Sequence, residues 1–355
     1  MATSDKEFAI VVFGASGFTG QFVVREVAKN CKGKFKWAVA GRSKDKLEKV
    51  LQETASELGQ YVGDVGVMVA NCSDEASLST MCSSAKIVLN CVGPYRFYGE
   101  PVVKAAVENG CHHLDISGEP EFLETMQHKY HDKAVCAGVH VVGTCGFDSI
   151  PADMGVVFTQ ESFPGELCHL ESFLTLHSGP KGSKGHYGTY QSIIYGIASD
   201  REGNLKKLRK ELFPTPMPKF GPKLARRDEA SLSTMCSSAK IVLNCVGPYR
   251  FYGEPVVKAA VENGCHHLDI SGEPEHPKFF SCGFFSHEGP TREQAGYVAT
   301  PICMVQAAMV ILEETLPNSG GVLTPAAAFT GTSLIDRLNE NGVMFSVLSC
   351  KESEK

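Results

Sequence analysis

Along the first 150 residues, short apolar runs alternate with longer amphipathic segments. The apolar runs predict buried strands at residues 9–13, 36–40, 65–70, 87–92, 112–116 and 140–143. Apolar side chains at helical spacing predict helices at residues 17–30, 44–58, 100–109 and 120–137. This alternation is typical of an α/β fold, a doubly wound parallel sheet with helices on both faces.

The pattern is less regular after residue 150. Residues 167–176 resemble a strand of another sheet, 179–188 a glycine-rich loop, and 206–227 a basic, proline-dotted surface linker. Towards the end, residues 297–314 and 334–339 are predicted to be helices. The second half therefore predicts a second region outside the parallel sheet, followed by a final segment that contains helices.

An internal repeat interrupts that second half. Residues 74–121 recur letter for letter as residues 228–275. Structural repeats are similar rather than identical and occur in three or more copies. We therefore interpret this repeat as a recent duplication, or as an exon-assembly error or aberrant splice product. The first copy follows the third strand directly, so we expect it to occupy the sheet and the second copy, with its apolar run 242–247, to be an appendage.

Composition narrows the class of protein. The chain has 355 residues and a formal charge of -6, without a basic stripe that would favour nucleic acid. Its 14 cysteines include no C-x-x-C pair, which predicts reduced thiols in an intracellular protein. No window of 18 apolar residues occurs, so no transmembrane helix is predicted.

A glycine motif joins the first strand to the first helix. Gly14, Gly17 and Gly20 have the spacing of a dinucleotide-binding loop, in which glycines permit the tight turn and the close approach of phosphates. The loop is expected to bind a dinucleotide through Gly14, Ala15, Ser16, Gly17, Phe18, Thr19 and Gly20. The alternative is a tight strand–helix turn that binds nothing.

The residues after the second strand indicate which dinucleotide binds. NAD-binding folds normally place Asp or Glu there, whereas this chain has Arg42 and Ser43. Arginine can pair with a 2′-phosphate and serine can donate a hydrogen bond to it, so NADP(H) is favoured over NAD(H). Asn71, after the third strand, is predicted to contact the adenine.

The loop after the fourth strand should lie beside the cofactor, because ligands bind at the carboxyl ends of strands where the strand order reverses. Its residues are Cys91, Val92, Gly93, Pro94 and Tyr95. Tyr95 and Tyr98 are candidate proton donors, with half-buried packing as the alternative for each.

Acidic residues follow the next two strands. Asp115, Glu119 and Asp148 are candidate acid, base or substrate-amine partners. The alternative is that they cap helices and order loops. No metal is expected, because the adjacent His112 and His113 point to opposite faces of a strand.

Together these motifs resemble the saccharopine dehydrogenase family, most closely its animal branch of saccharopine dehydrogenase-like oxidoreductases. The motifs are VVFGASGFTG (11–20), AVAGRS (38–43), VLNCVGPYRFYGE (88–100), LDISGE (114–119), GFDSIPAD (146–153), GYVATPI (296–302) and GVLTPAAAF (321–329). The resemblance implies a Rossmann NADP-binding domain (1–150), part of an α+β substrate domain (151–227), the duplicate (228–275) and a C-terminal segment that returns to the first domain (276–355).

The resemblance also implies an activity and a location. The activity is hydride transfer between NADP(H) and an unidentified carbonyl or imine substrate, with a homodimer left open. The implied location is a lipid droplet, another membrane or the mitochondrion. The implied process is glycolipid biosynthesis. The duplicate stands where the family continues its second domain. The alternatives are therefore a non-catalytic NADP(H)-binding protein on lipid surfaces or a defective isoform.

Overall fold

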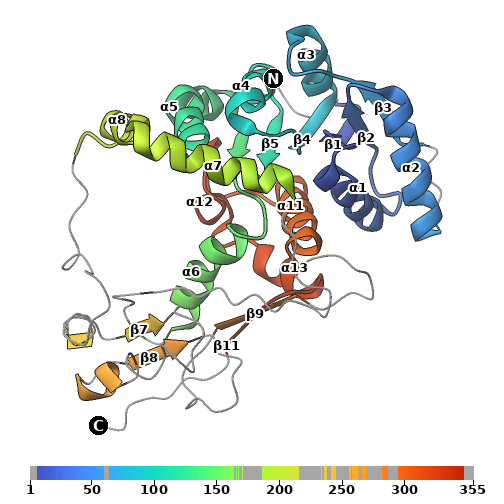
Figure 1. The fold of residues 1–355 in the computed structure, drawn as a ribbon. Coiled ribbons are helices and arrows are strands. Elements are labelled where there is room, and N and C mark those ends of the chain that lie inside the picture. Colours follow the sequence, from blue (N-terminus) through green and yellow to red (C-terminus); the bar gives the residue numbers. More distant parts are fainter. Residues whose placement is uncertain are drawn as a thin grey trace. The chain divides into compact units, whose positions relative to one another are not determined.

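A computed structural model describes residues 6–59, 64–163, 186–215 and 295–347, with short stretches at 241–244, 258–263, 266–269 and 282–286 and a few single residues between 165 and 256 (Figure 1). The chain divides into two compact units. Unit 1 comprises Met1–Asp153, Lys184–Pro214 and Ser286–Val343, and unit 2 comprises Met154–Ser183, Thr215–Phe285 and Met344–Lys355. Every candidate site residue from the sequence lies in unit 1.

Unit 1 contains a seven-stranded parallel sheet with the order β10-β6-β5-β4-β1-β2-β3. The strands are β1 (Phe8–Phe13), β2 (Trp37–Gly41), β3 (Gly66–Val69), β4 (Ala85–Asn90), β5 (His112–Asp115), β6 (His140–Val142) and β10 (Gly321–Leu323). The direction of strand addition reverses between β1 and β4, so the doubly wound α/β fold is confirmed.

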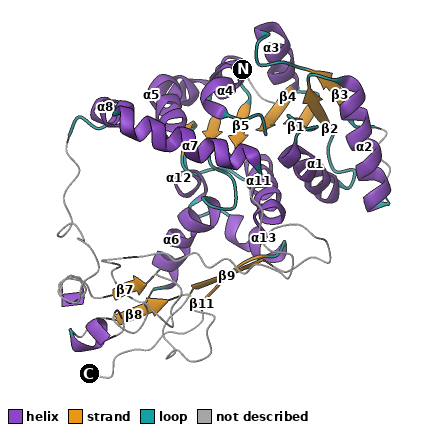
Figure 2. Cartoon of the chain, in the orientation of Figure 1, coloured by secondary structure: helices purple, strands orange, loops and turns teal. Residues whose placement is uncertain are grey.

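Helices cover both faces of this sheet (Figure 2). The helices of the described chain are α1 (Phe18–Cys31), α2 (Lys44–Leu58), α3 (Glu75–Ser84), α4 (Tyr95–Glu108), α5 (Pro120–Ala137), α6 (Ile150–Ser162, which continues into unit 2), α7 (Tyr187–Glu202), α8 (Asn204–Leu212), α11 (Ala295–Glu313), α12 (Pro325–Phe329) and α13 (Leu334–Glu340). Helix α1 packs against α2 and α11, whereas α4 packs against α3 and α5. Residues of β1 are buried on both faces, as expected for a parallel sheet between two helical layers.

The first copy of the repeat supplies β4 and β5 of the sheet, as predicted. In unit 2 the second copy forms a separate parallel pair, β7 (Ile241–Asn244) and β8 (His266–Asp269). Strands β9 (Cys282–Ser286) and β11 (Val343–Val347) form another two-stranded sheet. The predicted strand at 167–176 falls almost entirely outside the described residues.

Residues 184–214 lie in unit 1, and the resemblance assigns residues 151–227 to the substrate domain. Helices α7 and α8 both pack against α5, and Arg209 of α8 pairs with Glu124 of α5 at 2.6 Å. The start of the predicted linker 206–227 is therefore helical. Within α8, Leu205 is the buried residue.

Candidate dinucleotide site

The glycine loop lies between β1 and α1 and is built for close approach. Gly14 has φ +82°, and a Cβ atom there would lie 2.7 Å from Cγ2 of Val92. A Cβ atom on Gly20 would lie 2.1 Å from the carbonyl oxygen of Gly14. The N-cap of α1 is Gly17, which provides no side-chain hydrogen bond to the first turn. The loop therefore leaves the helix N-terminus open to an anion such as a pyrophosphate.

The loop after β4 contacts the glycine loop, as its place in the strand order predicts. The N–H of Cys91 donates to the carbonyl of Phe13 at 2.8 Å, and the N–H of Val92 donates to Oδ1 of Asn90 at 3.0 Å. Gly93 and Pro94 continue this loop into α4. Burial, with a smaller contribution from the charge of Asp115, raises the pKa of the Cys91 thiol to about 12. The thiol is therefore neutral near pH 7 and is not an activated nucleophile.

The ends of β2 and β3 hold the other predicted cofactor residues. Arg42 is exposed and makes no ion pair or hydrogen bond with the residues that the structure describes. Ser43 is the N-cap of α2, again without a side-chain cap, and Ser16 of the glycine loop lies beside Gly41. This edge presents an uncommitted guanidinium and hydroxyl, which suits a 2′-phosphate.

Asn71 is committed to the turn that begins α3. Its side-chain oxygen accepts a hydrogen bond from the N–H of Ser73 at 3.3 Å, and its own N–H donates to Oγ of Ser77 at 3.1 Å. The residue is exposed. Its amide nitrogen is the part that can still contact an adenine.

The hydroxyl of Tyr95 is buried and already hydrogen-bonded, so it is not an available proton donor. Tyr95 is 6% exposed, and its hydroxyl donates to the carbonyl oxygen of Asn90 at 2.8 Å. Burial raises the pKa of its hydroxyl well above the usual value. This geometry favours the packing alternative, in which Tyr95 holds the loop after β4 in place, whereas Tyr98 is 43% exposed.

Asp115 is the centre of a buried polar network at the ends of β4 and β5. Its Oδ1 accepts hydrogen bonds from the N–H groups of Ser117 at 2.9 Å and Thr144 at 3.2 Å. Its Oδ2 lies 3.8 Å from Nδ1 of His113, whose Nε2 lies 3.3 Å from the amide nitrogen of Asn90. Because that amide is a donor, the proton of the neutral imidazole lies on Nδ1 and faces Asp115. Burial raises the pKa of Asp115 to about 7.

Glu119 acts as a helix cap. Its two carboxylate oxygens accept hydrogen bonds from the N–H of Tyr95 at 2.9 Å and of Arg96 at 3.0 Å, which are the first residues of α4. Ser192 of α7 donates to the same carboxylate at 3.1 Å. These bonds favour the capping alternative for Glu119. Asp148, in contrast, is exposed in the turn before α6.

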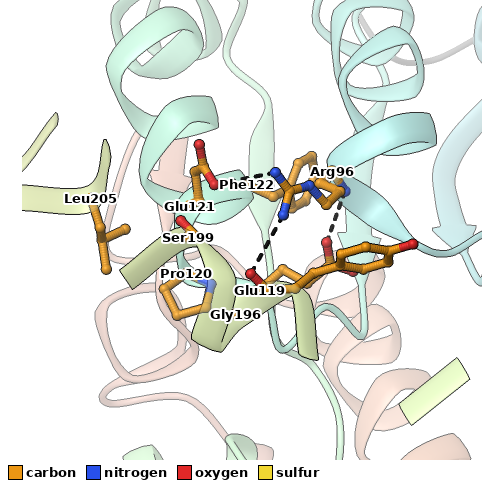
Figure 3. A pocket seen from close by; sticks show the side chains of 9 residues that line it. Arg96, Glu119, Pro120, Glu121, Phe122, Gly196, Ser199 and Leu205 are labelled. Carbon is orange, nitrogen blue, oxygen red and sulfur yellow. Dashed lines mark hydrogen bonds and ion pairs between the residues drawn. The ribbon is translucent and has the colours of Figure 1, made fainter. Parts of the chain in front are cut away.

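A shallow pocket lies beside Glu119, between α4, α5 and α7 (Figure 3). Arg96 donates to the carbonyl of Tyr195 at 3.4 Å and lies 3.7 Å from Oε2 of Glu121. Its guanidinium also faces the rings of Phe97 and Tyr195, at 5.5 and 5.2 Å from their centroids. Ser192 and Tyr195 could not be predicted as site residues, because no local pattern links them to Glu119 and Arg96, which lie 73 and 99 positions earlier.

The described residues contain no group of three His, Cys, Asp or Glu side chains that would hold a metal ion. In that part of the chain, no helix has the length and apolar character needed to span a bilayer.

A parallel sheet with a glycine loop at its switch point defines a dinucleotide-binding domain. Residues 10–142 match the model of the saccharopine dehydrogenase NADP-binding domain. The human saccharopine dehydrogenase-like oxidoreductase is 42% identical over 434 residues, covering 99% of this chain and 100% of the relative. The chain belongs to this family of saccharopine dehydrogenase-like oxidoreductases, and NADP(H) is confirmed as the cofactor of its first domain.

The chain is also similar to a nematode protein and to a solved yeast structure. The lipid droplet localized protein of Caenorhabditis elegans is 33% identical, over 96% of this chain and 98% of the relative. The apo structure of saccharopine dehydrogenase (L-Glu forming) from Saccharomyces cerevisiae has 17% identity and a TM-score of 0.35, covering 44% of this chain and 32% of that one. The alignment with the human relative extends over 434 residues, whereas this chain has 355, so the relative contains segments without a counterpart here.

Proposed function

We propose that this protein is an NADP(H)-dependent oxidoreductase that transfers a hydride between the nicotinamide and a carbonyl or imine substrate. The observation that carries the proposal is the contact between the glycine loop and the loop after β4, at the switch point of the sheet. Ligands of doubly wound folds bind at this place. The N-cap residue of α1, Gly17, makes no side-chain hydrogen bond to the first turn, which suits a pyrophosphate at this helix N-terminus.

The residues of the site divide into three roles. The first turn of α1 binds the pyrophosphate, and Arg42 and Ser43 bind the 2′-phosphate. NADPH, when bound, supplies the hydride. Tyr95 and Glu119 position the loop after β4 by fixing the start of α4.

The proton is the remaining requirement of a carbonyl or imine reduction. Burial raises the pKa of Asp115 to about 7, so this carboxyl group can hold a proton near neutral pH, and we assign that role to it. Asp148 is exposed at the same edge of the sheet, and we assign it to substrate binding.

The test is a screen of carbonyl and imine compounds in which the absorbance of NADPH is measured over time. We expect substrate-dependent oxidation of NADPH that is abolished in Gly17→Val and reduced in Asp115→Asn. Asp269→Asn is the matched control, because Asp269 is the same residue in the second copy. NADPH binding without oxidation by any compound would refute hydride transfer. No binding of NADPH would instead indicate a defective isoform.

A second candidate function is NADP(H) binding at a lipid surface. The observation that favours it is an apolar face of α7 that the structure leaves exposed, formed by Tyr187, Tyr190, Ile193, Ile194 and Ile197 at 44–68% exposure. The next helix adds exposed Lys206 and Lys207. Apolar residues beside lysines suit the surface of an anionic membrane, and the relative from Caenorhabditis elegans is named for the lipid droplet.

Flotation with phosphatidylcholine vesicles, with and without phosphatidylserine, tests this second function. We expect binding that increases with phosphatidylserine and is lost in the double variant Ile194→Glu/Ile197→Glu. Val261→Glu is the control, because Val261 is an exposed apolar residue (67%) elsewhere. Equal loss in both variants, or no flotation of the wild type, would refute lipid binding through α7.

A further inference from the structure

Three aromatic side chains from distant parts of the sequence meet at the open end of α1. Phe18 is the first residue of this helix, directly after the glycine loop. The imidazole of His186, just before α7, stacks on its ring with centroids 4.3 Å apart and an interplanar angle of 9°. Tyr297, in the first turn of α11, meets the same ring edge-on at 4.8 Å and 88°. In Figure 1 the first turn of α7 accordingly lies close to α1 and α11.

Hydrogen bonds fix this cluster in one arrangement. The hydroxyl of Tyr297 accepts a hydrogen bond from the backbone N–H of His186 at 2.7 Å. One turn further along α11, Thr300 accepts from the N–H of Phe147 at 3.1 Å, which holds the helix against the loop after β6. The packing of α1 against α11 completes the support. Helix α1, the start of α7 and helix α11 therefore hold the cluster together beside the N-terminus of α1.

The cluster presents two hydrogen-bond donors. Nδ1 of His186 accepts from the N–H of Gly188 at 3.2 Å, so the proton of the neutral imidazole lies on Nε2. Tyr297 uses its oxygen as an acceptor and retains its O–H, with Oγ1 of Thr189 as far as 3.5 Å away. Neither donor is consumed by a short hydrogen bond among the described residues. Phe18 remains 41% exposed beside them.

We propose that His186 and Tyr297 form a phosphate clamp, donating hydrogen bonds from Nε2–H and O–H to the pyrophosphate of NADP(H) at the N-terminus of α1. The proposal rests on the same dinucleotide site as the proposed function. Two donors beside an uncapped helix N-terminus favour an anion. The 2′-phosphate is not their target, because Arg42 and Ser43 follow β2, on one side of β1, whereas α11, which carries Tyr297, contacts β4 and β5 on the other side of β1.

The test is the dissociation constant of the full chain for three ligands, measured by calorimetry. The ligands are NADPH, 2′-phospho-ADP-ribose, which lacks nicotinamide, and adenosine 2′-monophosphate, which keeps the 2′-phosphate but lacks both phosphates of the pyrophosphate. We expect His186→Ala and Tyr297→Phe each to weaken the first two ligands about tenfold, as for a hydrogen bond to a charged group, and to leave adenosine 2′-monophosphate unchanged. His186→Gln, which retains a donor, should restore part of the affinity.

A control variant separates the clamp from general damage. His128→Ala removes an exposed imidazole of α5 and should bind all three ligands like the wild type. Unchanged NADPH binding in His186→Ala and Tyr297→Phe would refute the clamp alone. A loss for NADPH but not for 2′-phospho-ADP-ribose would also refute it, by assigning the cluster to the nicotinamide. A wild type that binds no NADPH would refute the clamp and the proposed function together.

Discussion

Replacing Asp115 with asparagine is expected to stabilise unit 1 above pH 7 and to change its stability little at pH 4. The carboxyl group is 1% exposed and lies in the network at the ends of β4 and β5. An asparagine in its place retains a carbonyl oxygen that can accept from the N–H groups of Ser117 and Thr144. The variant therefore removes the buried charge and keeps the hydrogen bonds.

The size of the effect follows from the pKa of Asp115. Burial raises this pKa from 3.8 to about 7 in the folded chain. The protonated form thus contributes stability that is complete below pH 3.8 and is lost as the pH rises through 7. A shift of about 3 units corresponds to at most about 4 kcal/mol. Asparagine does not ionise, so the variant does not lose stability in this way. The free energy of unfolding of the variant should therefore exceed that of the wild type by an amount that grows by up to about 4 kcal/mol between pH 4 and pH 8.

Buried histidines have the opposite pH dependence. Burial lowers the pKa of His112 to about 4 and that of His113 to about 3. Their contribution to stability is present above pH 6.5 and is lost as the pH falls towards these values. Both histidines are unchanged in the variant. The difference between the variant and the wild type therefore isolates Asp115.

Urea unfolding from pH 4 to pH 8.5 measures this difference. Fluorescence of Trp37 reports on unit 1, because it is the single tryptophan and is 5% exposed in β2. Asp269→Asn, the same change in the second copy, is the control and should leave the tryptophan transition unchanged. An advantage of Asp115→Asn that is equal at pH 4 and pH 8 would refute the assignment of a buried, titrating carboxyl group.

Three further changes test the glycine loop, the 2′-phosphate contact and the cap of α4. Gly20→Ala should cost about 1–3 kcal/mol in urea unfolding and abolish NADPH binding, because its Cβ would overlap the carbonyl oxygen of Gly14; wild-type stability would contradict the close approach. Arg42→Ala should weaken NADPH about tenfold or more in calorimetry and leave NADH unchanged, and equal weakening of both would contradict a 2′-phosphate contact. Glu119→Ala should lower the tryptophan-monitored stability by about 1–2 kcal/mol, since two N–H groups of α4 lose their acceptor, whereas Glu273→Ala should not.

The sequence predicts elements whose determinants are local. Helix α2 and helix α5 have the predicted bounds, since each combines helical periodicity with a C-cap glycine, Gly59 or Gly138, in the left-handed region. Helix α4 begins at Tyr95, earlier than predicted, because its cap is Glu119, which follows it by 24 positions. The sequence does not predict strand β10, which pairs with β6, a strand far from it in the sequence.

The site shows the same division between local and distant determinants. The glycine loop and the loop after β4 could be predicted to meet, because the strand order of a doubly wound sheet makes β1 and β4 neighbours. Tyr95 could not be assigned a role from its sequence position, because burial and the hydrogen bond to Asn90 decide its chemistry. The resemblance places His186 in the substrate domain (151–227) and Tyr297 in the C-terminal segment that returns to the first domain (276–355), and no local pattern links either residue to the glycine loop.

The two copies of the repeat show which structural features the repeated sequence determines by itself and which depend on its neighbours in the fold. In both copies the same strands pair in the same register, Ile87 with His112 and Ile241 with His266. A side-chain contact is also shared: Ser79 bonds to Asn109 at 3.1 Å, and the equivalent Ser233 bonds to Asn263 at 3.3 Å. These interactions form within the repeated segment, so identical residues reproduce them.

Burial of the same residue differs between the copies where the neighbours come from outside the segment. Val107 is 6% exposed and packs with Phe122 and Tyr130 of α5, whereas its equivalent, Val261, is 67% exposed. Strand β4 likewise has β1 as a neighbour, whereas β7 pairs with β8 in a sheet of two strands. Strand β1 ends at the glycine loop, and the chain contains that loop once. The second copy therefore repeats the candidate acids of the first without the phosphate-binding turn that a dinucleotide site requires.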